Sequence, residues 1–274
     1  MTTVVIVLLI IIAVGLLFWL WAIAPRLIKK PSWGNMKNYP YAHRGLHDDV
    51  LPENSMGAFE AAVSHGYGME FDLQLTKDKK VVVHHDRSLK RVCGVDKSIG
   101  DLSYDELKEI KLGDSQYSTP LFSDVLKMVD GKVPMVIEIK NYDKISELCS
   151  LVWEELKDYK GEYCIESFHP FIVRWFRKHQ PQVVRGQLMT KFTGKEPNGY
   201  PNAPMAWLAT NLFTNCLTRP DFEAYDHRHR DNLSLRTARK LYNLQEVSWT
   251  VRSIDNYKDL TEDNCLCIFE DFTP

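Results

Sequence analysis

The sequence predicts an α/β protein: a (β/α)8 TIM barrel preceded by one N-terminal transmembrane helix. One observation behind this prediction is an uncharged apolar run, Val4–Ala24, near the amino end. Another is the alternation of short β-rich runs with amphipathic helical periods along the rest of the chain. The 274 residues are 45% hydrophobic with a formal charge of −2, which permits a sizeable core and gives no basic bias toward nucleic acid.

Residues 3–24 are the predicted transmembrane helix. About twenty apolar residues span the hydrocarbon core of a bilayer, and Trp19 and Trp21 suit its interface. A cleaved signal peptide is the alternative, because the run ends in the small-residue sequence AIA. Against cleavage, the amino end carries no Lys or Arg and Pro25 would follow the cut.

Charge and cysteine content predict where the rest of the chain lies. Arg26, Lys29 and Lys30 directly follow the apolar run, so the positive-inside rule predicts a single-pass protein with its large C-terminal part in the cytoplasm. The cysteines lack the spacing of a disulfide framework or a zinc finger, which fits a reducing compartment. They are Cys93, Cys149, Cys164, Cys216, Cys265 and Cys267, and the last two are expected on one face of a strand.

The remaining chain divides into a juxtamembrane linker, 25–38, and a single barrel domain, 39–274. The linker includes the turn-rich sequence PSWGNMKN. The predicted barrel strands are YPYAHR, MEFDLQL, PMVIEI, EYCIESF, VVRGQLM, DFEAYD, EVSWTV and LCIFEDF. Helical periods are expected at 57–65, 145–159, 171–179 and 234–243.

One further β-rich run breaks the alternation. VVVHH, at 81–85, follows MEFDLQL after only TKDKK, which is too short for a parallel crossover. The two runs are therefore predicted to form an antiparallel hairpin. This hairpin opens an insertion after the second barrel strand, at about 76–121, which includes a short helix with a capping box from Ser103 to Glu106. Eight barrel strands remain without it.

Functional side chains are expected where the predicted strands end, because barrels of this class carry their chemistry at the C-terminal ends of the strands. The residues there are His43, Arg44, Glu70, Asp72, Glu138, Lys140, Ser167, Phe168 and Trp249. Glu70 and Asp72 are two apart, so a strand points both to one face. Two confined carboxylates repel unless a cation lies between them, and oxygen ligands suit calcium or magnesium. Glu138 can add a third oxygen, and one ion-paired acid beside an exposed acid is the structural alternative.

Two cations and a histidine complete this predicted site. Arg44 offers a planar fork to phosphate oxygens and Lys140 a second positive charge, although buried salt bridges would explain the same residues. The hairpin brings His85 to the acids if its register sets His85 opposite Asp72 or Glu70, with His84 turned away. The convergence of these residue types favours a phosphate-processing site.

The motifs resemble those of the glycerophosphodiester phosphodiesterase family. HRG followed by PENS, EFDLQLTKD followed by VVVHHD, then IEIK, SFHP and SWTV occur in the family's order and approximate spacing, over nearly all of 39–274. The resemblance implies a barrel enzyme that uses a divalent metal to hydrolyse glycerophosphodiesters to glycerol phosphate and an alcohol. Substrate choice is expected to depend on loops such as 191–204.

The resemblance also implies roles for individual residues. By role they are His43 and His85 as general acid and base; Glu70, Asp72 and Glu138 as metal ligands; Arg44 and Lys140 as phosphate contacts; Glu53 as a further site carboxylate; and Trp249 as an aromatic wall. Two residues depart from the family pattern: Arg252 stands where Asn commonly follows WTV, and Glu270 is unusual in the last strand. Neither is expected to touch the metal or the histidines.

The expected mechanism uses the substrate as its own nucleophile. The sequence has no nucleophile elbow, and a cationic pocket suits phosphoryl rather than acyl transfer. A glycerol hydroxyl held beside phosphorus has an effective molarity on the order of 10⁵ M or more, so we expect it to attack first and give a cyclic phosphate that water opens. His43 and His85 would exchange proton-transfer roles between the two steps.

Three alternatives stay open at this point. A lysophospholipase D acting on lysophospholipids at the membrane surface is close in chemistry, and the predicted anchor would favour it. A catalytically inactive barrel that only binds phosphodiesters would not need the full set of acids and histidines. A metal-independent glycosidase would leave Arg44, Lys140 and both histidines unexplained.

Overall fold

Eight parallel strands close into a barrel in the computed structural model, which describes residues 2–140, 142, 144–192 and 202–274. The barrel closes because β1 pairs with both β2 and β9. The barrel strands are β1 (Tyr41–Ala42), β2 (Gly68–Leu75), β4 (Met135–Ile139), β5 (Tyr163–Ser167), β6 (Val184–Met189), β7 (Phe222–Asp226), β8 (Gln245–Val251) and β9 (Leu266–Phe269). The predicted fold class is confirmed.

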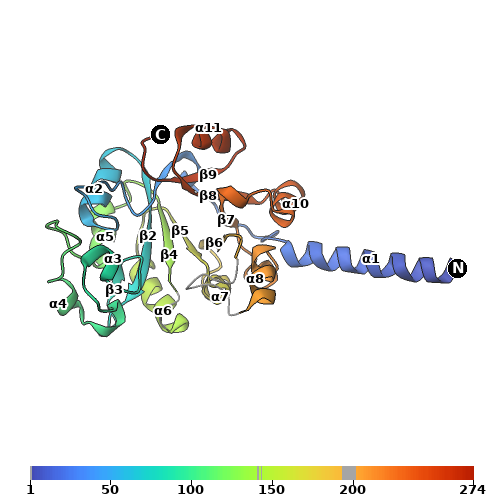
Figure 1. The fold of residues 1–274 in the computed structure, drawn as a ribbon, viewed down its shortest axis with the longest axis horizontal. Coiled ribbons are helices and arrows are strands. Elements are labelled where there is room, and N and C mark those ends of the chain that lie inside the picture. The colour runs from blue at the N-terminus through green and yellow to red at the C-terminus, as the bar shows by residue number, and fades with distance from the viewer. Residues whose placement is uncertain (1, 141, 143, 193–201) are drawn as a thin grey trace.

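Helices flank the strands (Figure 1). They are α2 (Met56–Ser64), α5 (Phe122–Val129), α6 (Ile145–Leu156), α7 (Pro170–His179), α8 (Ala203–Thr210), α9 (Asn215–Thr218), α10 (Leu233–Tyr242) and α11 (Ile254–Glu262), with short 3₁₀ turns η1 (Met36–Asn38) and η3 (His227–His229). Four of them coincide with the predicted helical periods. The Ser55 side chain caps α2 by accepting a hydrogen bond from the Ala58 N–H, which fixes the end of the loop after β1.

The insertion begins as the predicted antiparallel hairpin. Strand β3 (Val81–Val83) pairs with β2, and the chain continues through α3 (Lys90–Cys93), η2 (Ile99–Asp101) and α4 (Tyr104–Leu107). The expected capping box between Ser103 and Glu106 is present. The insertion packs around an apolar cluster of its own, which stabilises it beside the barrel. The cluster comprises Val82, Leu89, Ile99, Leu102 and Leu107.

Strand alternation decides which side chains enter the barrel. On β2, Met69, Phe71 and Leu73 belong to the large outer core between strands and helices. The residues between them, Glu70 and Asp72, therefore point into the barrel. At the other end of the barrel its interior is apolar and includes the linker residue Met36. Polar side chains are thus gathered at the carboxyl ends of the strands.

Helix α1 (Thr2–Ile23) projects from the side of the barrel (Figure 1). Its most apolar 18-residue window has a mean hydropathy of 3.1 and is 0% buried. Only Ala22 and Ile23, at its end, are buried against the domain. Length and composition fit a membrane span, and a signal sequence near an amino end has the same properties.

Candidate active site

Three carboxylates meet inside the barrel. Glu70 and Asp72 on β2 and Glu138 on β4 each offer an oxygen within 4.8 Å of the others, and all three residues are buried. The parallel register places Asp72 directly beside Glu138. The two-residue spacing therefore puts both β2 acids on the inner face, as the sequence predicts, and the structure brings the third acid to them.

The negative charge of this cluster is only partly compensated. Lys140 Nζ lies 2.7 Å from Asp72 Oδ1 and 2.8 Å from Glu138 Oε2. Burial acts to raise the pKa of Asp72, but Lys140 and other cations hold it well below its usual value. Burial raises the pKa of Glu70 well above its usual value, and the neighbouring acids, including the buried Glu166 on β5, raise it further. Negative charge on Glu70 is therefore the least favourable of the set.

This set of donors fits a divalent metal ion. Carboxylate oxygens from two neighbouring strands are the ligand type that calcium and magnesium take. A cation among Glu70, Asp72 and Glu138 would offset the repulsion that raises the pKa of Glu70. The cluster thus has both the oxygen atoms and the uncompensated charge that such an ion requires.

The loop after β1 covers the acids. Arg44 adopts the left-handed conformation, with φ of 55°, and its backbone N–H donates to Glu70 Oε2 at 3.1 Å. Its guanidinium Nη1 donates to Glu53 Oε1 at 2.8 Å, while its Nε lies 3.8 Å from Asp72 Oδ2. Asn54 Nδ2 also donates to Asp72 Oδ2, at 2.9 Å. This loop therefore brings Arg44 to the acids and Glu53 to Arg44, and the roles expected of both residues stay predictions.

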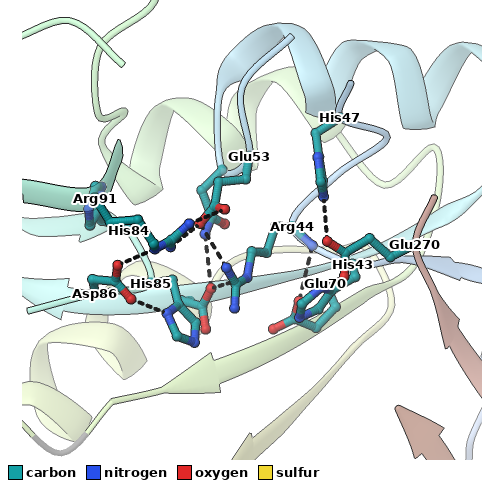
Figure 2. Close-up of polar contacts among 12 residues, drawn as sticks. His43, Arg44, His47, Glu53, Glu70, His84, His85, Asp86, Arg91 and Glu270 are labelled. Carbon is teal, nitrogen blue, oxygen red and sulfur yellow. Dashed lines mark hydrogen bonds and ion pairs between the residues drawn. The ribbon is translucent and has the colours of Figure 1, made fainter. Parts of the chain in front are cut away.

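His43 lies between two carboxylates. Its Nδ1 is 2.9 Å from Glu270 Oε2, and its Nε2 is 3.8 Å from Glu70 Oε2 (Figure 2). Glu270 also lies 3.4 Å from His47 Nε2 and accepts a hydrogen bond from Arg252 Nη2 at 2.5 Å. Burial lowers the pKa of His43, and the hydrogen bond to Glu270 opposes that effect.

The expectation that Glu270 does not touch the histidines is wrong. Barrel closure is the reason, because β9 runs parallel to β1 and the His43 N–H donates to the Phe269 carbonyl at 2.9 Å. The residue after Phe269 is therefore held next to His43. Arg252 follows β8, the other neighbour of β9, and contacts the same carboxylate.

His85 reaches the acids by a route that differs from the predicted one. The register pairs Leu73 with Val83, so His84 lies opposite Asp72, and the His84 N–H donates to the Asp72 carbonyl at 2.9 Å. The chain then bends, and Gln74 Nε2 donates to the carbonyls of residues 84, 85 and 86. The bend places His85 close enough to lower the pKa of Asp72. In the view of Figure 2, Arg44 lies between His85 and His43.

Each proposed acid–base histidine has a carboxylate on Nδ1. His85 Nδ1 lies 2.7 Å from Asp86 Oδ1, just as His43 Nδ1 lies 2.9 Å from Glu270. Such a partner favours the tautomer with its proton on Nδ1, which leaves Nε2 free to exchange a proton. The arrangement can therefore move protons on both sides of Arg44.

A sequence profile of the glycerophosphoryl diester phosphodiesterase family matches residues 43–274. The chain belongs to this family. A glycerophosphodiester phosphodiesterase of Bacillus altitudinis is 34% identical over 161 residues, which are 52% of this chain and 63% of that protein. A lysophospholipase D of Rattus norvegicus is 36% identical over 135 residues, 44% of this chain and 42% of that protein. The matches thus span about two fifths to two thirds of these relatives' lengths.

Solved structures of similar proteins share the barrel. An Oleispira antarctica phosphodiesterase, solved with the product sn-glycerol-3-phosphate, has a TM-score of 0.69 at 19% identity and covers 84% of this chain and 92% of that one. A glycerophosphodiester phosphodiesterase of Thermotoga maritima has a TM-score of 0.65 at 24% identity and covers 84% of this chain and 94% of that one. At these identities the likeness establishes the fold.

An ion-pair network ties this phosphodiesterase-family site to the insertion. Arg91, on α3, donates from Nη1 and Nη2 to both oxygens of Glu53 at 2.7 Å and from Nε to Asp86 at 2.5 Å. Burial acts to raise the pKa of Glu53, but the bonds from Arg91 lower it to about 2. Arg91 and Asp86 are not among the site residues that the sequence predicts. The adjacency of Asp86 to His85 was an available signal, whereas nothing local connects Arg91 with Glu53.

Aromatic rings from β8 and from the segments after β5 and β6 contact one another in this member of the phosphodiesterase family. Trp249 on β8 makes an edge-to-face contact with Phe168, with ring centroids 5.5 Å apart, and Phe168 contacts Phe192 at 6.2 Å. Phe192 also packs against the cluster that contains Ile23 of α1. These rings therefore form a row from Trp249 toward the base of α1, and the role of Trp249 as an aromatic wall stays a prediction. Most of the loop 191–204 lies outside the described residues.

Proposed function

We propose that this chain hydrolyses glycerophosphodiesters to glycerol phosphate and an alcohol. The observation that carries the proposal is the meeting of three buried acids, two cations and two carboxylate-paired histidines at one end of the barrel. Membership of the glycerophosphoryl diester phosphodiesterase family supports the same reaction. A phosphodiester-binding protein without activity would not need a proton-transfer group on either side of Arg44.

Arg44 and Lys140 bind the phosphate of the substrate. The guanidinium fork of Arg44 suits phosphate oxygens, and Lys140 adds a positive charge beside the acids. Glu70, Asp72 and Glu138 would hold a divalent cation, which would supply further positive charge to the phosphate and lower the pKa of a nearby hydroxyl. The aromatic face of Trp249 bounds the space available to the leaving alcohol.

His43 and His85 transfer the protons. In the first step one histidine takes the proton of the glycerol hydroxyl as that oxygen attacks phosphorus, and the other protonates the departing alkoxide. The product is a cyclic phosphate. In the second step the roles reverse, a water loses its proton as it attacks, and the ring oxygen that leaves gains one. A substrate analogue without that hydroxyl should therefore be cleaved far more slowly, and equal rates would contradict the cyclic intermediate.

The metal requirement is tested by paired variants. Glu70→Ala/Asp72→Ala should abolish hydrolysis of a soluble glycerophosphodiester and remove the dependence on added calcium or magnesium. The control replaces Glu154 and Asp158, an exposed pair at the end of α6, and should retain full activity. Full activity of the wild-type protein after exhaustive chelation would contradict the metal-dependent reaction.

Helix α1 supports a second part of the proposal, a single-pass anchor with the catalytic domain in the cytoplasm. The apolar exposed helix and the basic residues Arg26, Lys29 and Lys30 carry this part. The half-buried thiols of Cys93 and Cys216 provide the test. An impermeant thiol reagent should label them only after cells are permeabilised, and labelling of intact cells would contradict the orientation.

Lysophospholipase D activity is the second candidate function. It is favoured by the row of Trp249, Phe168 and Phe192, which leads from the site to residues around Ile23. An acyl chain that follows this row would keep contact with apolar side chains. Phe168→Ala should then lower kcat/KM for a lysophosphatidylcholine much more than for glycerophosphocholine. Equal losses for both substrates would contradict a lipid-specific role.

A further inference from the structure

Helix α8 is apolar on its exposed side. Met205, Trp207 and Leu208 are 44%, 58% and 40% exposed, whereas Ala206 and Ala209 are buried beneath them. The whole helix reads APMAWLAT and contains no charged residue. A helix that is apolar on all sides normally has an apolar environment on all sides. The outward face of α8 is therefore built for contact with something other than water.

The exposed surface of α8 is continuous with that of α1. Phe213, just beyond α8, contacts the Trp207 ring at 5.6 Å and the Phe18 ring of α1 at 6.4 Å, and Phe18 in turn contacts Trp21 at 5.8 Å. In Figure 1, α8 lies beside the base of α1. The exposed rings of Trp207, Phe18 and Trp21 are thus connected through the half-buried ring of Phe213, which joins the predicted membrane helix to the catalytic domain.

Several hydrogen bonds hold α1 in a fixed direction. Arg219 Nη1 donates to the carbonyls of Trp21 and Ala24 at 2.8 and 2.7 Å, and the Tyr242 hydroxyl donates to the Leu20 carbonyl at 3.0 Å. Trp19 Nε1 donates to Ser234 Oγ of α10 at 3.1 Å. Helix α1 is therefore anchored to the side of the barrel, so its insertion in a bilayer would also fix the tilt of the domain.

Helix α10 supplies the other side of the same surface. Leu233 and Leu241 are 67% and 57% exposed, and each adjoins a residue that bonds to α1, Ser234 and Tyr242 respectively. The Arg219 guanidinium lies 5.0 Å from the centroid of the Trp21 ring, which places a positive charge at the level of the helix base. We call these residues the α8–α10 collar: Met205, Trp207, Leu208, Leu233 and Leu241.

We propose that the α8–α10 collar lies in the lipid interface around the base of α1. The barrel then rests on the bilayer on its side, with α8 and α10 in contact with lipid. The occupant is the bilayer surface because the collar continues the exposed apolar surface of α1. Arg219 lies over the Trp21 ring at the base of α1, and Lys29 and Lys30 follow that base in the chain, so positive charge is available there for headgroup phosphates. This inference rests on the proposed membrane span of α1.

Fluorescence quenching of the full chain in vesicles tests the collar. With Cys93 and Cys216 changed to Ser, Leu208→Cys and Leu233→Cys would each carry an environment-sensitive dye. The vesicles would contain phosphatidylcholine, phosphatidylglycerol and a shallow doxyl-labelled lipid. The control site is Glu109→Cys in the exposed insertion, which lies far from α1 in Figure 1. A label at Ile12→Cys reports insertion of α1 itself.

We expect doxyl lipid to quench both collar labels about twofold or more, because interfacial apolar groups lie within the headgroup and upper acyl region. The Glu109 label should be unchanged. Quenching at Ile12 without quenching at Leu208 would overturn the collar alone, whereas no quenching at Ile12 would overturn the span on which it rests. The dye at Leu208→Cys could instead show a blue shift of its emission that grows with the protein-to-lipid ratio and does not depend on doxyl lipid. That result would assign the surface to a second copy of this chain.

Discussion

Glu270→Gln tests whether a carboxylate on the last strand orients His43. The substitution keeps the size and a hydrogen-bond acceptor but removes the negative charge beside His43 Nδ1, 2.9 Å away. It also presents an amide that can turn its NH₂ toward the ring, which would favour the tautomer with the proton on Nε2. Catalysis as proposed needs His43 to accept and return a proton at Nε2, so both effects act against turnover.

The size of the effect follows from the contacts of Glu270. A hydrogen bond between a carboxylate and a charged group contributes about 1.5–3 kcal/mol, which corresponds to about 10- to 150-fold in rate. Arg252 and His47 share the same carboxylate, at 2.5 and 3.4 Å, and they reduce the charge available to His43. We therefore expect kcat to fall by the lower part of that range, about 10- to 50-fold, with little change in KM.

The assay is steady-state hydrolysis of a soluble glycerophosphodiester across pH. Because Glu270 acts to raise the pKa of His43, its neutralisation should move the acidic limb of kcat/KM to lower pH. Asp271→Asn is the matched control, since Asp271 bonds to Arg252 Nε at 2.9 Å and is mostly exposed. An unchanged kcat, or an equal loss in Asp271→Asn, would refute the positioning role of Glu270.

Three other predictions concern the metal, pH and packing. Calcium at 100 times its Kd should raise the free energy of unfolding of the wild-type protein by about 2.7 kcal/mol, or its Tm by about 5–10 °C. A thermal-shift scan of Glu70→Gln should show no such increase. Burial lowers the pKa of His84 to about 4, so the unfolded state binds a proton on this imidazole more tightly than the folded state does. The free energy of unfolding should therefore fall by up to about 3 kcal/mol from pH 6.5 to pH 4. Urea titrations of His84→Gln should show a weaker dependence of that free energy on pH. Gly186→Ala should lower the free energy of unfolding by about 1–3 kcal/mol in the same titrations, because the added Cβ would overlap the Phe222 ring. A Gly186→Ala protein as stable as the wild type would show that the ring moves freely.

The parts of the site that the sequence predicts are those governed by local geometry. Strand alternation alone places Glu70 and Asp72 on one face, and the short hairpin can only be antiparallel. His85 is a mixed case, because its arrival at the acids depends on a bend held by Gln74 and not on the register of the strand. The pairing of residues within one strand is visible in a sequence, but the path of the chain beyond it is not.

Two of the missed contacts cross large separations in the chain. Glu270 and His43 are 227 residues apart and meet only because β9 closes the barrel against β1. Arg91 and Glu53 are 38 residues apart and meet because the insertion folds back over the loop after β1. Neither pair leaves a periodic or spacing signal, so the closure of the barrel and the path of the insertion had to be known before these two pairs could be found.

The bonds from Arg91 to Glu53 and Asp86 also set the limits of what can be exchanged between relatives. Residues 76–121 resemble a unit that another barrel could accept, since their interior packs on its own cluster. A graft that brings a different residue to position 91 would nevertheless remove the two hydrogen bonds from Arg91 to the half-buried Glu53 and leave it with Arg44 as a partner. The transplantable unit is therefore the insertion together with the acidic residue of the first loop, and chimaeras should be designed to keep that pair intact.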